Sequence, residues 1–157
     1  MYAPIIIFAF NRPNALKNTV LSLLENKESK DSDLFIFVDG ARANKPNEKE
    51  NVAKVQEYVT TVIGKYGKAI VLEDDLVFSP NFLAFMNEGL NRYETEQKVF
   101  SICGYSNKVS PPKDYPYDAY FCTRSSSWGW ATWQDRWKTI DWELKNWDKY
   151  SQMKKAF

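Results

Sequence analysis

The chain has 157 residues, of which 44% are hydrophobic and 26% charged, a composition typical of one folded domain and not of a disordered chain. The 21 Lys and Arg nearly balance the 20 Asp and Glu, and the formal net charge of +1 gives no support to nucleic-acid binding. The apolar run over residues 5–8 is too short to span a bilayer and follows no basic segment. We therefore expect no membrane span and no signal peptide, and a cytoplasmic location, either free or peripheral to the inner membrane.

The sequence contains no histidine. Because histidine is the usual general base near neutral pH, its absence excludes Ser-His-Asp and Cys-His hydrolases. Two cysteines, Cys103 and Cys122, are too few for a tetrahedral zinc site, and their apolar surroundings predict buried reduced thiols. A metal ion in this protein is therefore expected to be a hard ion, Mn²⁺ or Mg²⁺, with oxygen ligands.

The first hundred residues alternate between two hydrophobic patterns. Continuous apolar runs predict strands buried on both faces, and apolar residues at helical spacing predict helices between them. We expect strands over residues 4–10, 34–38, 68–72 and 99–103 and helices over residues 13–26, 48–63 and 79–90. Pro13 suits the first turn of a helix, and Gly64 and Gly67 are expected to end the second one. The order β-α-β-α-β-α-β predicts an α/β fold with a parallel sheet and right-handed crossovers.

Polar side chains follow three of the predicted strands. Asn11 and Arg12 follow the first, Asp39 follows the second, and Glu73-Asp74-Asp75, the acidic triplet, follows the third. Ligands of parallel α/β sheets bind at the carboxyl ends of the strands, so these side chains are expected to converge on one edge. Each of them is also a normal capping or turn residue, and only their convergence indicates a site. Strand alternation further predicts that the outer two acids of the triplet share one face and that Asp74 points away.

The C-terminal part is rich in tryptophan, with all six Trp between residues 128 and 147. A short strand is expected over residues 119–123. The spacing of Trp130, Trp133 and Trp137 predicts one face of a helix, and we expect the last two to belong to the core. Trp128 and Trp130 flank a glycine beside three serines, which suits either a platform for the apolar face of a sugar or core packing.

Four segments together resemble a GT-A glycosyltransferase, in particular the bacterial sugar transferases related to the N-acetylglucosaminyltransferase I type. They are Phe10-Asn11-Arg12-Pro13, Val38-Asp39-Gly40, Leu72-Glu73-Asp74-Asp75 and Trp128-Gly129-Trp130. The resemblance implies a Rossmann-like α/β/α sandwich of three layers with a mostly parallel sheet. It implies one nucleotide-sugar-binding domain over residues 1–157, with an acceptor-side segment at about 119–147.

The resemblance also implies roles for individual residues, with the acidic triplet as a motif of the D-x-D type. The implied roles are Asp75 as ligand of Mn²⁺ or Mg²⁺, Glu73 and Asp74 facing the ribose or donor sugar, Asp39 binding the base, Asn11 and Arg12 lining the nucleotide, and Trp128 and Trp130 on the acceptor side. The implied reaction is an inverting, metal-dependent transfer of a sugar from a nucleotide diphosphate-sugar, UDP-sugar above all, to a glycan or lipid-linked acceptor in polysaccharide biosynthesis. Such a transfer needs a carboxylate base, and no pattern selects between Asp135 and Asp141.

Two further hypotheses remain from the residues. One is a nucleotide-sugar or glycan-binding module without catalytic activity, since no base is identified. The other is a nucleotidyltransferase, although Asn11-Arg12-Pro13-Asn14 is not a Gly- and Lys-rich triphosphate loop. The chain also departs from the family pattern at residues 63–67, where family members have a further strand and helix. Either the chain is a reduced form or segments are missing there and after residue 157.

Overall fold

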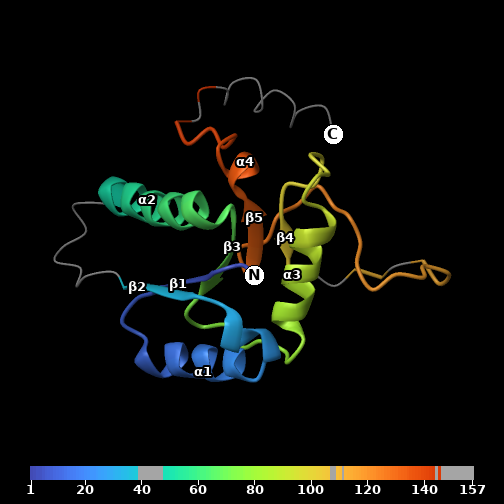
Figure 1. The fold of residues 1–157 in the computed structure, drawn as a ribbon, viewed down its shortest axis with the longest axis horizontal. Coiled ribbons are helices and arrows are strands. Elements are labelled where there is room, and N and C mark those ends of the chain that lie inside the picture. Colours follow the sequence, from blue (N-terminus) through green and yellow to red (C-terminus); the bar gives the residue numbers. More distant parts are fainter. Residues whose placement is uncertain (39–47, 107–108, 111, 144, 146–157) are drawn as a thin grey trace.

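A five-stranded sheet forms the centre of the structure (Figure 1). The computed structural model describes residues 1–38, 48–106, 109–110, 112–143 and 145, with only the backbone of residues 48–53 and 55. In chain order the elements are β1 (Ile5–Ala9), α1 (Pro13–Leu24), a 3₁₀ helix η1 (Lys27–Asp31), β2 (Leu34–Val38), α2 (Glu48–Tyr66), β3 (Lys68–Glu73), α3 (Phe82–Arg92), β4 (Ile102–Cys103), β5 (Trp130–Trp133) and α4 (Gln134–Trp137). The fold is mixed α/β, as the sequence predicts.

The sheet is parallel on one side and antiparallel on the other. Its strand order is β2-β1-β3-β5-β4, and β1 pairs in parallel with both β2 and β3. The predicted parallel pairing is thus confirmed for β1, β2 and β3. The fourth predicted strand, β4, runs in the same direction but does not pair with them, because the antiparallel β5 lies between. The place next to β3 is taken by the antiparallel β5, because β5 forms a four-residue ladder with β3 while β4 has only two residues to pair.

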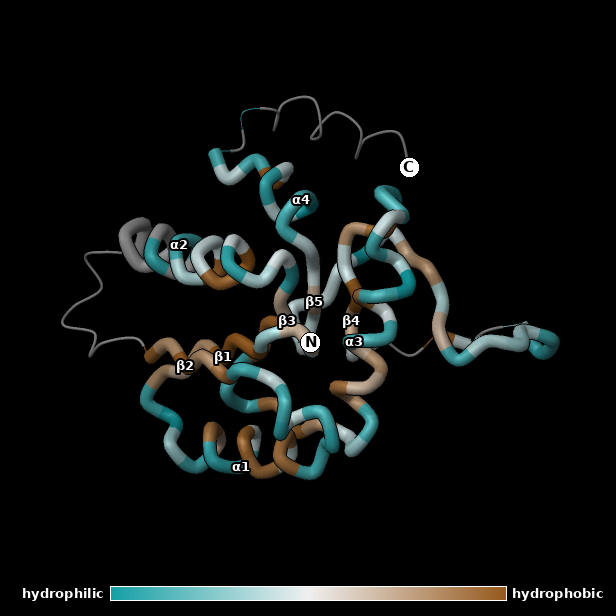
Figure 2. Tube along the Cα trace, viewed as in Figure 1, coloured by the Kyte–Doolittle hydropathy of each residue, from teal (hydrophilic) through white to brown (hydrophobic). Residues whose placement is uncertain are grey.

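Helices cover both faces of this sheet. Ile5, Ile7 and Leu72 lie in one buried cluster with the inner sides of α1 and α3, whereas Ile6 and Val71 lie in a second cluster with α2. Figure 1 shows α1 and α2 on opposite sides of β1 and β2, and Figure 2 shows that these strands are among the most hydrophobic parts of the trace. Burial on both faces is the physical reason that β1 and β3 read as continuous apolar runs. The predicted burial of β2 on both faces is wrong, because Leu34, Ile36 and Val38 are exposed on one face of this outer strand.

The end of α2 differs from the prediction. The helix continues through Gly64 and ends at Tyr66, so the expected break at Gly64 is wrong. Gly67 does end it, with φ of 78° and its N–H donating to the carbonyl of Ile63 at 2.8 Å. Only a positive φ at this position lets the chain reverse into β3, and glycine adopts it without strain.

The tryptophan-rich part folds differently from the prediction. Residues 130–133 form strand β5 and not a helix, because pairing with β3 outweighs the helical spacing of the Trp side chains. Trp133 and Trp137 are buried, as predicted. Residues 119–123 form no strand, so Cys122 is exposed and its predicted burial is wrong; Cys103 is partly buried, and both thiols are free.

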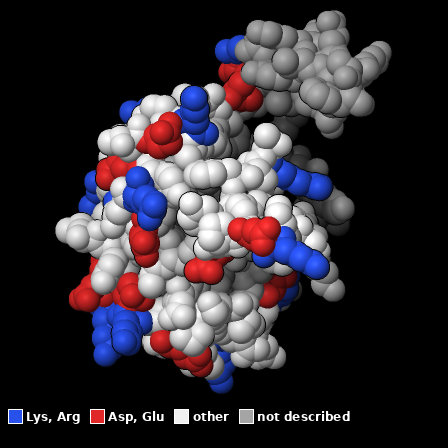
Figure 3. All heavy atoms as spheres, turned by 90° about the vertical axis from the view of Figure 1, so that its right-hand side faces the viewer, with Lys and Arg blue, Asp and Glu red and all other residues white. Residues whose placement is uncertain are grey.

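The surface carries mixed charge. On the face shown in Figure 3, Lys and Arg side chains alternate with Asp and Glu side chains, in keeping with the formal net charge of +1. In the described part of the chain, no helix combines the length and the apolarity needed to cross a membrane.

Two glycines join β4 to β5 above an aromatic pair. The N–H of Gly104 donates to the carbonyl of Gly129 at 2.8 Å, and the rings of Phe78 and Phe82 lie beneath, with centroids 4.3 Å apart. A Cβ at Gly104 would lie 2.3 Å from a ring carbon of Phe82. The absence of a side chain therefore lets the end of β4 rest directly on α3.

We predict that Gly104→Ala lowers the free energy of unfolding by about 1–3 kcal/mol, since the added methyl group forces Phe82 out of its position. Urea denaturation measures the change. Gly64→Ala is the matched control: its Cβ meets nothing closer than 3.7 Å, and the helical position predicts a gain of about 0.5–1 kcal/mol. Equal effects of the two substitutions would contradict the packing argument.

Candidate functional site

The parallel pairing of β1 and β3 brings two of the predicted polar segments together. Because Phe8 is opposite Glu73, the residues after β1 and the acidic triplet after β3 meet at the edge where the parallel strands end, the carboxyl edge. The predicted convergence with the triplet is confirmed for Arg12, which contacts Asp74 and Asp75, and Asn11 lies just before it. Asp39, the predicted ligand of the base, lies outside the described residues.

Asp74 is buried at the centre of the carboxyl edge. Its side chain is 1% exposed, its Oδ2 accepts the Phe10 N–H at 2.8 Å, and its Oδ1 accepts Arg12 Nη2 at 2.5 Å. Strand alternation does not apply here, because β3 ends at Glu73 and the chain turns at once. Asp74 therefore turns into the protein, while Asp75 remains exposed and Glu73 is partly buried.

Arg12 connects the buried acid to the exposed one. Its Nη1 donates to Asp75 Oδ2 at 2.6 Å, and its side chain is 51% exposed. Partial loss of hydration lowers the pKa of the Arg12 guanidinium, but Asp74 and Asp75 raise it by more, so it carries a permanent positive charge. Asn11, just before it, is exposed and has φ of 41°, a left-handed conformation that asparagine tolerates better than most residues.

Three buried polar residues of α1 and of the turn after it hold the chain that follows the triplet. Thr19 and Ser22 belong to α1, and Asn26 lies just after it, before η1. The Thr19 hydroxyl lies 2.9 Å from the Asp74 carbonyl and 2.8 Å from the Leu76 carbonyl, and Ser22 Oγ and Asn26 Oδ1 accept the N–H groups of Phe78 and Leu83. The sequence analysis missed these residues. Their spacing of three and four on the apolar side of a predicted helix is the signal that identifies them.

The donor set of the carboxyl edge fits a hard cation. All its acidic ligands are carboxylate oxygens, and Asp75 is the one that is exposed and already paired with a positive group. Among the described residues, no three Asp, Glu, Cys or His side chains are arranged to hold a metal by themselves. If Mn²⁺ or Mg²⁺ binds at the carboxyl edge, Asp75 is the carboxylate that would hold it.

Asp135 lies at the other end of the sheet. Trp133 is opposite Lys68, the first residue of β3, and the Gln134 N–H donates to the Gly67 carbonyl. The candidate base that follows Trp133 is thus separated from the acidic triplet by the length of β3. Asp141, the other candidate, is partly buried beyond α4.

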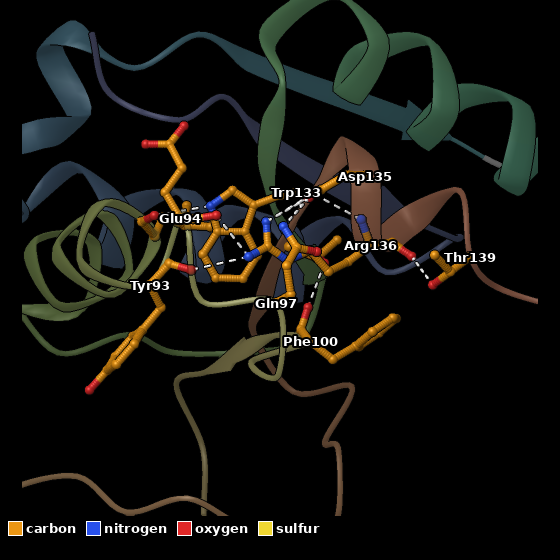
Figure 4. A network of polar contacts seen from close by, with 10 residues as sticks. Tyr93, Glu94, Gln97, Phe100, Trp133, Asp135, Arg136 and Thr139 are labelled. Atoms are coloured by element: carbon orange, nitrogen blue, oxygen red, sulfur yellow. Dashed lines mark hydrogen bonds and ion pairs between the residues drawn. The ribbon is translucent and has the colours of Figure 1, made fainter.

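Asp135 belongs to a network that fastens α4 to the end of α3 (Figure 4). Buried Arg136 donates to both Asp135 oxygens and to the carbonyls of Tyr93 and Glu94, and its guanidinium lies 4.3 Å from the Trp133 ring centre. The hydrogen bond from Gln97 lowers the pKa of the Asp135 carboxyl; partial burial opposes this, and Arg136 lowers the pKa further. A lowered pKa makes this carboxylate a weaker base.

The two tryptophans of the acceptor-side prediction lie in different environments. Trp130 is partly buried and stacks on Trp137 with ring centroids 6.1 Å apart. Trp128 is 48% exposed, and its ring meets the exposed ring of Tyr105 edge-on at 4.6 Å. Because β5 is antiparallel to β3, with Trp130 opposite Val71, the residues before Trp130 lie toward the carboxyl edge.

We predict that Asp74→Ala costs about 2–3 kcal/mol of unfolding free energy, because it leaves the partly buried Phe10 N–H without its acceptor and takes the buried charge partner from Arg12. Asp75→Ala, which removes an exposed carboxylate from the same cation, costs less than about 1 kcal/mol. Chemical denaturation of both variants checks this order. A reversed order would show that Asp74 does not organise the carboxyl edge.

The lowered pKa of Asp135 predicts a pH-dependent contribution to stability. The unfolded chain binds a proton at Asp135 more readily than the folded protein, so the contribution is fully present above the unfolded pKa and disappears as the pH falls through the folded pKa. Thermal denaturation of wild type and Asp135→Asn should differ at neutral pH and converge at low pH. A difference that persists unchanged in acid would show that the carboxylate charge contributes nothing.

No protein-family model matches this chain, and no curated protein matches it. The assignment of a function therefore depends on the geometry of the carboxyl edge and on the chemistry of its side chains.

Proposed function

We propose that this protein is a metal-dependent glycosyltransferase with a GT-A-like fold that uses a nucleotide diphosphate-sugar, UDP-sugar in the first place. The observation that carries the proposal is the arrangement of Arg12 and Asp75. An exposed carboxylate and a half-exposed guanidinium lie side by side at the carboxyl edge, fixed from below by the buried Asp74. Parallel α/β sheets bind their ligands at this edge.

The chemistry of the two exposed groups matches the charge pattern of the donor. Asp75 offers an oxygen ligand to Mn²⁺ or Mg²⁺, and a bound divalent cation supplies the positive charge that stabilises a diphosphate leaving group. Arg12 offers N–H donors whose planar geometry suits phosphate oxygens. Glu73 is partly buried at the end of β3 and is proposed to face the sugar part of the donor.

The acceptor side is proposed to lie at Trp128. The exposed rings of Trp128 and Tyr105 offer an apolar surface of the kind that stacks against a sugar ring, and they lie toward the carboxyl edge. Trp130 is the weaker candidate, because its ring is stacked against Trp137. The acceptor is proposed to be a glycan or a lipid-linked sugar.

A binding module without turnover is the second candidate. The observation that favours it is the position of Asp135, which is at the opposite end of β3 and in an ion pair with Arg136. The release of UDP from a UDP-sugar in the presence of Mn²⁺ distinguishes the two functions. A binding module binds the UDP-sugar but releases no UDP over time, whereas a transferase releases UDP when it transfers or hydrolyses the sugar.

We predict that UDP binds in a Mn²⁺-dependent manner. Asp75→Ala should weaken this binding at least tenfold, because it removes the carboxylate that is proposed to hold the metal ion. Isothermal titration with and without Mn²⁺ measures it. Asp114→Ala, which removes another exposed aspartate, is the matched control and should bind as wild type does. Unchanged affinity in Asp75→Ala would contradict the proposed metal site, and stronger binding of UTP than of UDP-sugars would favour a nucleotidyltransferase.

A further inference from the structure

The guanidinium of Arg12 is shared between two carboxylates of very different exposure. Nη2 contacts Asp74, whose side chain is 1% exposed, and Nη1 contacts Asp75, whose side chain is 39% exposed. The two contacts use different nitrogens, so one of them is able to open while the other stays closed. This asymmetry is the starting point of a proposal that rests on the proposed function.

The buried half of the contact is fixed from several sides. Asp74 accepts a backbone N–H from Phe10 as well as Arg12, and its own carbonyl accepts the Thr19 hydroxyl. Freeing Arg12 from Asp74 would leave a buried carboxylate without its charge partner, which is costly. The exposed half has no such support, because water solvates both Asp75 and Arg12 when they separate.

The local charge indicates what would break the exposed ion pair between Arg12 and Asp75. Among the described residues of the carboxyl edge, the acidic triplet and Arg12 together carry a negative formal charge. A divalent cation that binds Asp75 competes with Arg12 for the same carboxylate, and the two positive charges repel each other when both lie against it. Once released, Arg12 has free N–H donors beside the place where a diphosphate brings further negative charge.

We propose that Arg12 is a tethered cation that occupies Asp75 in the absence of metal and shifts to the diphosphate when a divalent cation takes Asp75. Asp74 is the positioning residue that keeps Arg12 at the carboxyl edge in both states. The ligand class is a nucleoside diphosphate or its sugar ester with Mn²⁺ or Mg²⁺. The proposal gives Arg12 two opposing effects: it weakens the binding of metal alone and strengthens the binding of nucleotide with metal.

The test measures these two effects separately in Arg12→Gln, with Mn²⁺ and UDP as the probes. Electron paramagnetic resonance measures the affinity for Mn²⁺ alone, and isothermal titration measures the affinity for UDP at saturating Mn²⁺. We expect Arg12→Gln to bind Mn²⁺ alone several-fold more tightly and UDP about tenfold more weakly than wild type. Arg12→Lys keeps the charge, so both of its affinities should lie between those of wild type and those of Arg12→Gln. Lys17→Gln removes an exposed charge elsewhere on α1 and should match wild type in both affinities.

Each outcome decides for or against the proposal. Opposite changes in the two affinities support it. If both affinities decrease in a variant with a wild-type circular dichroism spectrum, Arg12 has a purely structural role. If neither affinity changes, Arg12 takes no part in binding. Both results overturn the tether while leaving the proposed function intact. Failure of the wild type to bind UDP with Mn²⁺ overturns the proposed function and the tether together.

Discussion

The buried carboxylate of Asp74 is the interaction on which the carboxyl edge depends. A charge without water is tolerated only when hydrogen bonds and an opposite charge replace its hydration, and here Phe10 N–H and Arg12 do so. These partners come from the end of β1 and the start of α1, while Asp74 follows β3. One buried acid therefore fixes the relative position of the two segments that form the candidate site.

Buried polar residues of α1 and of the turn after it fix the chain that leaves the site. Thr19, Ser22 and Asn26 contact the backbone that follows the triplet, so an irregular segment without strand partners still has its polar groups satisfied. The aromatic pair Phe78 and Phe82 then packs beneath the glycines that join β4 to β5. Through these contacts the acidic end of β3 and the aromatic surface near Trp128 rest on the same helices.

The contacts at the opposite end of the sheet stabilise the junction of α3 and α4. Arg136 ties the C-terminal end of α3 to α4 through two backbone carbonyls, an ion pair with Asp135 and the face of Trp133. Such a network stabilises the junction of elements and leaves its carboxylate engaged. Both Asp135 and Asp75 are exposed, but the structure places Asp135 in the network of Arg136 and Gln97 at one end of β3 and Asp75 beside Arg12 at the carboxyl edge, a difference that the sequence does not show.

The sequence by itself determined the elements whose patterns are local. Apolar runs and helical spacing predicted β1, β2, β3 and the helices after them, because burial of a face imposes its period on the residues that form it. It also predicted that Arg12 and the acidic triplet meet, since parallel strands end at one edge. Only the tertiary structure decided that β5 and not β4 pairs with β3, that Asp74 turns inward, and that Trp128 and Trp130 differ in exposure. These features depend on pairing and packing between residues far apart in the chain, and no local pattern records which partner a strand or a carboxylate finds.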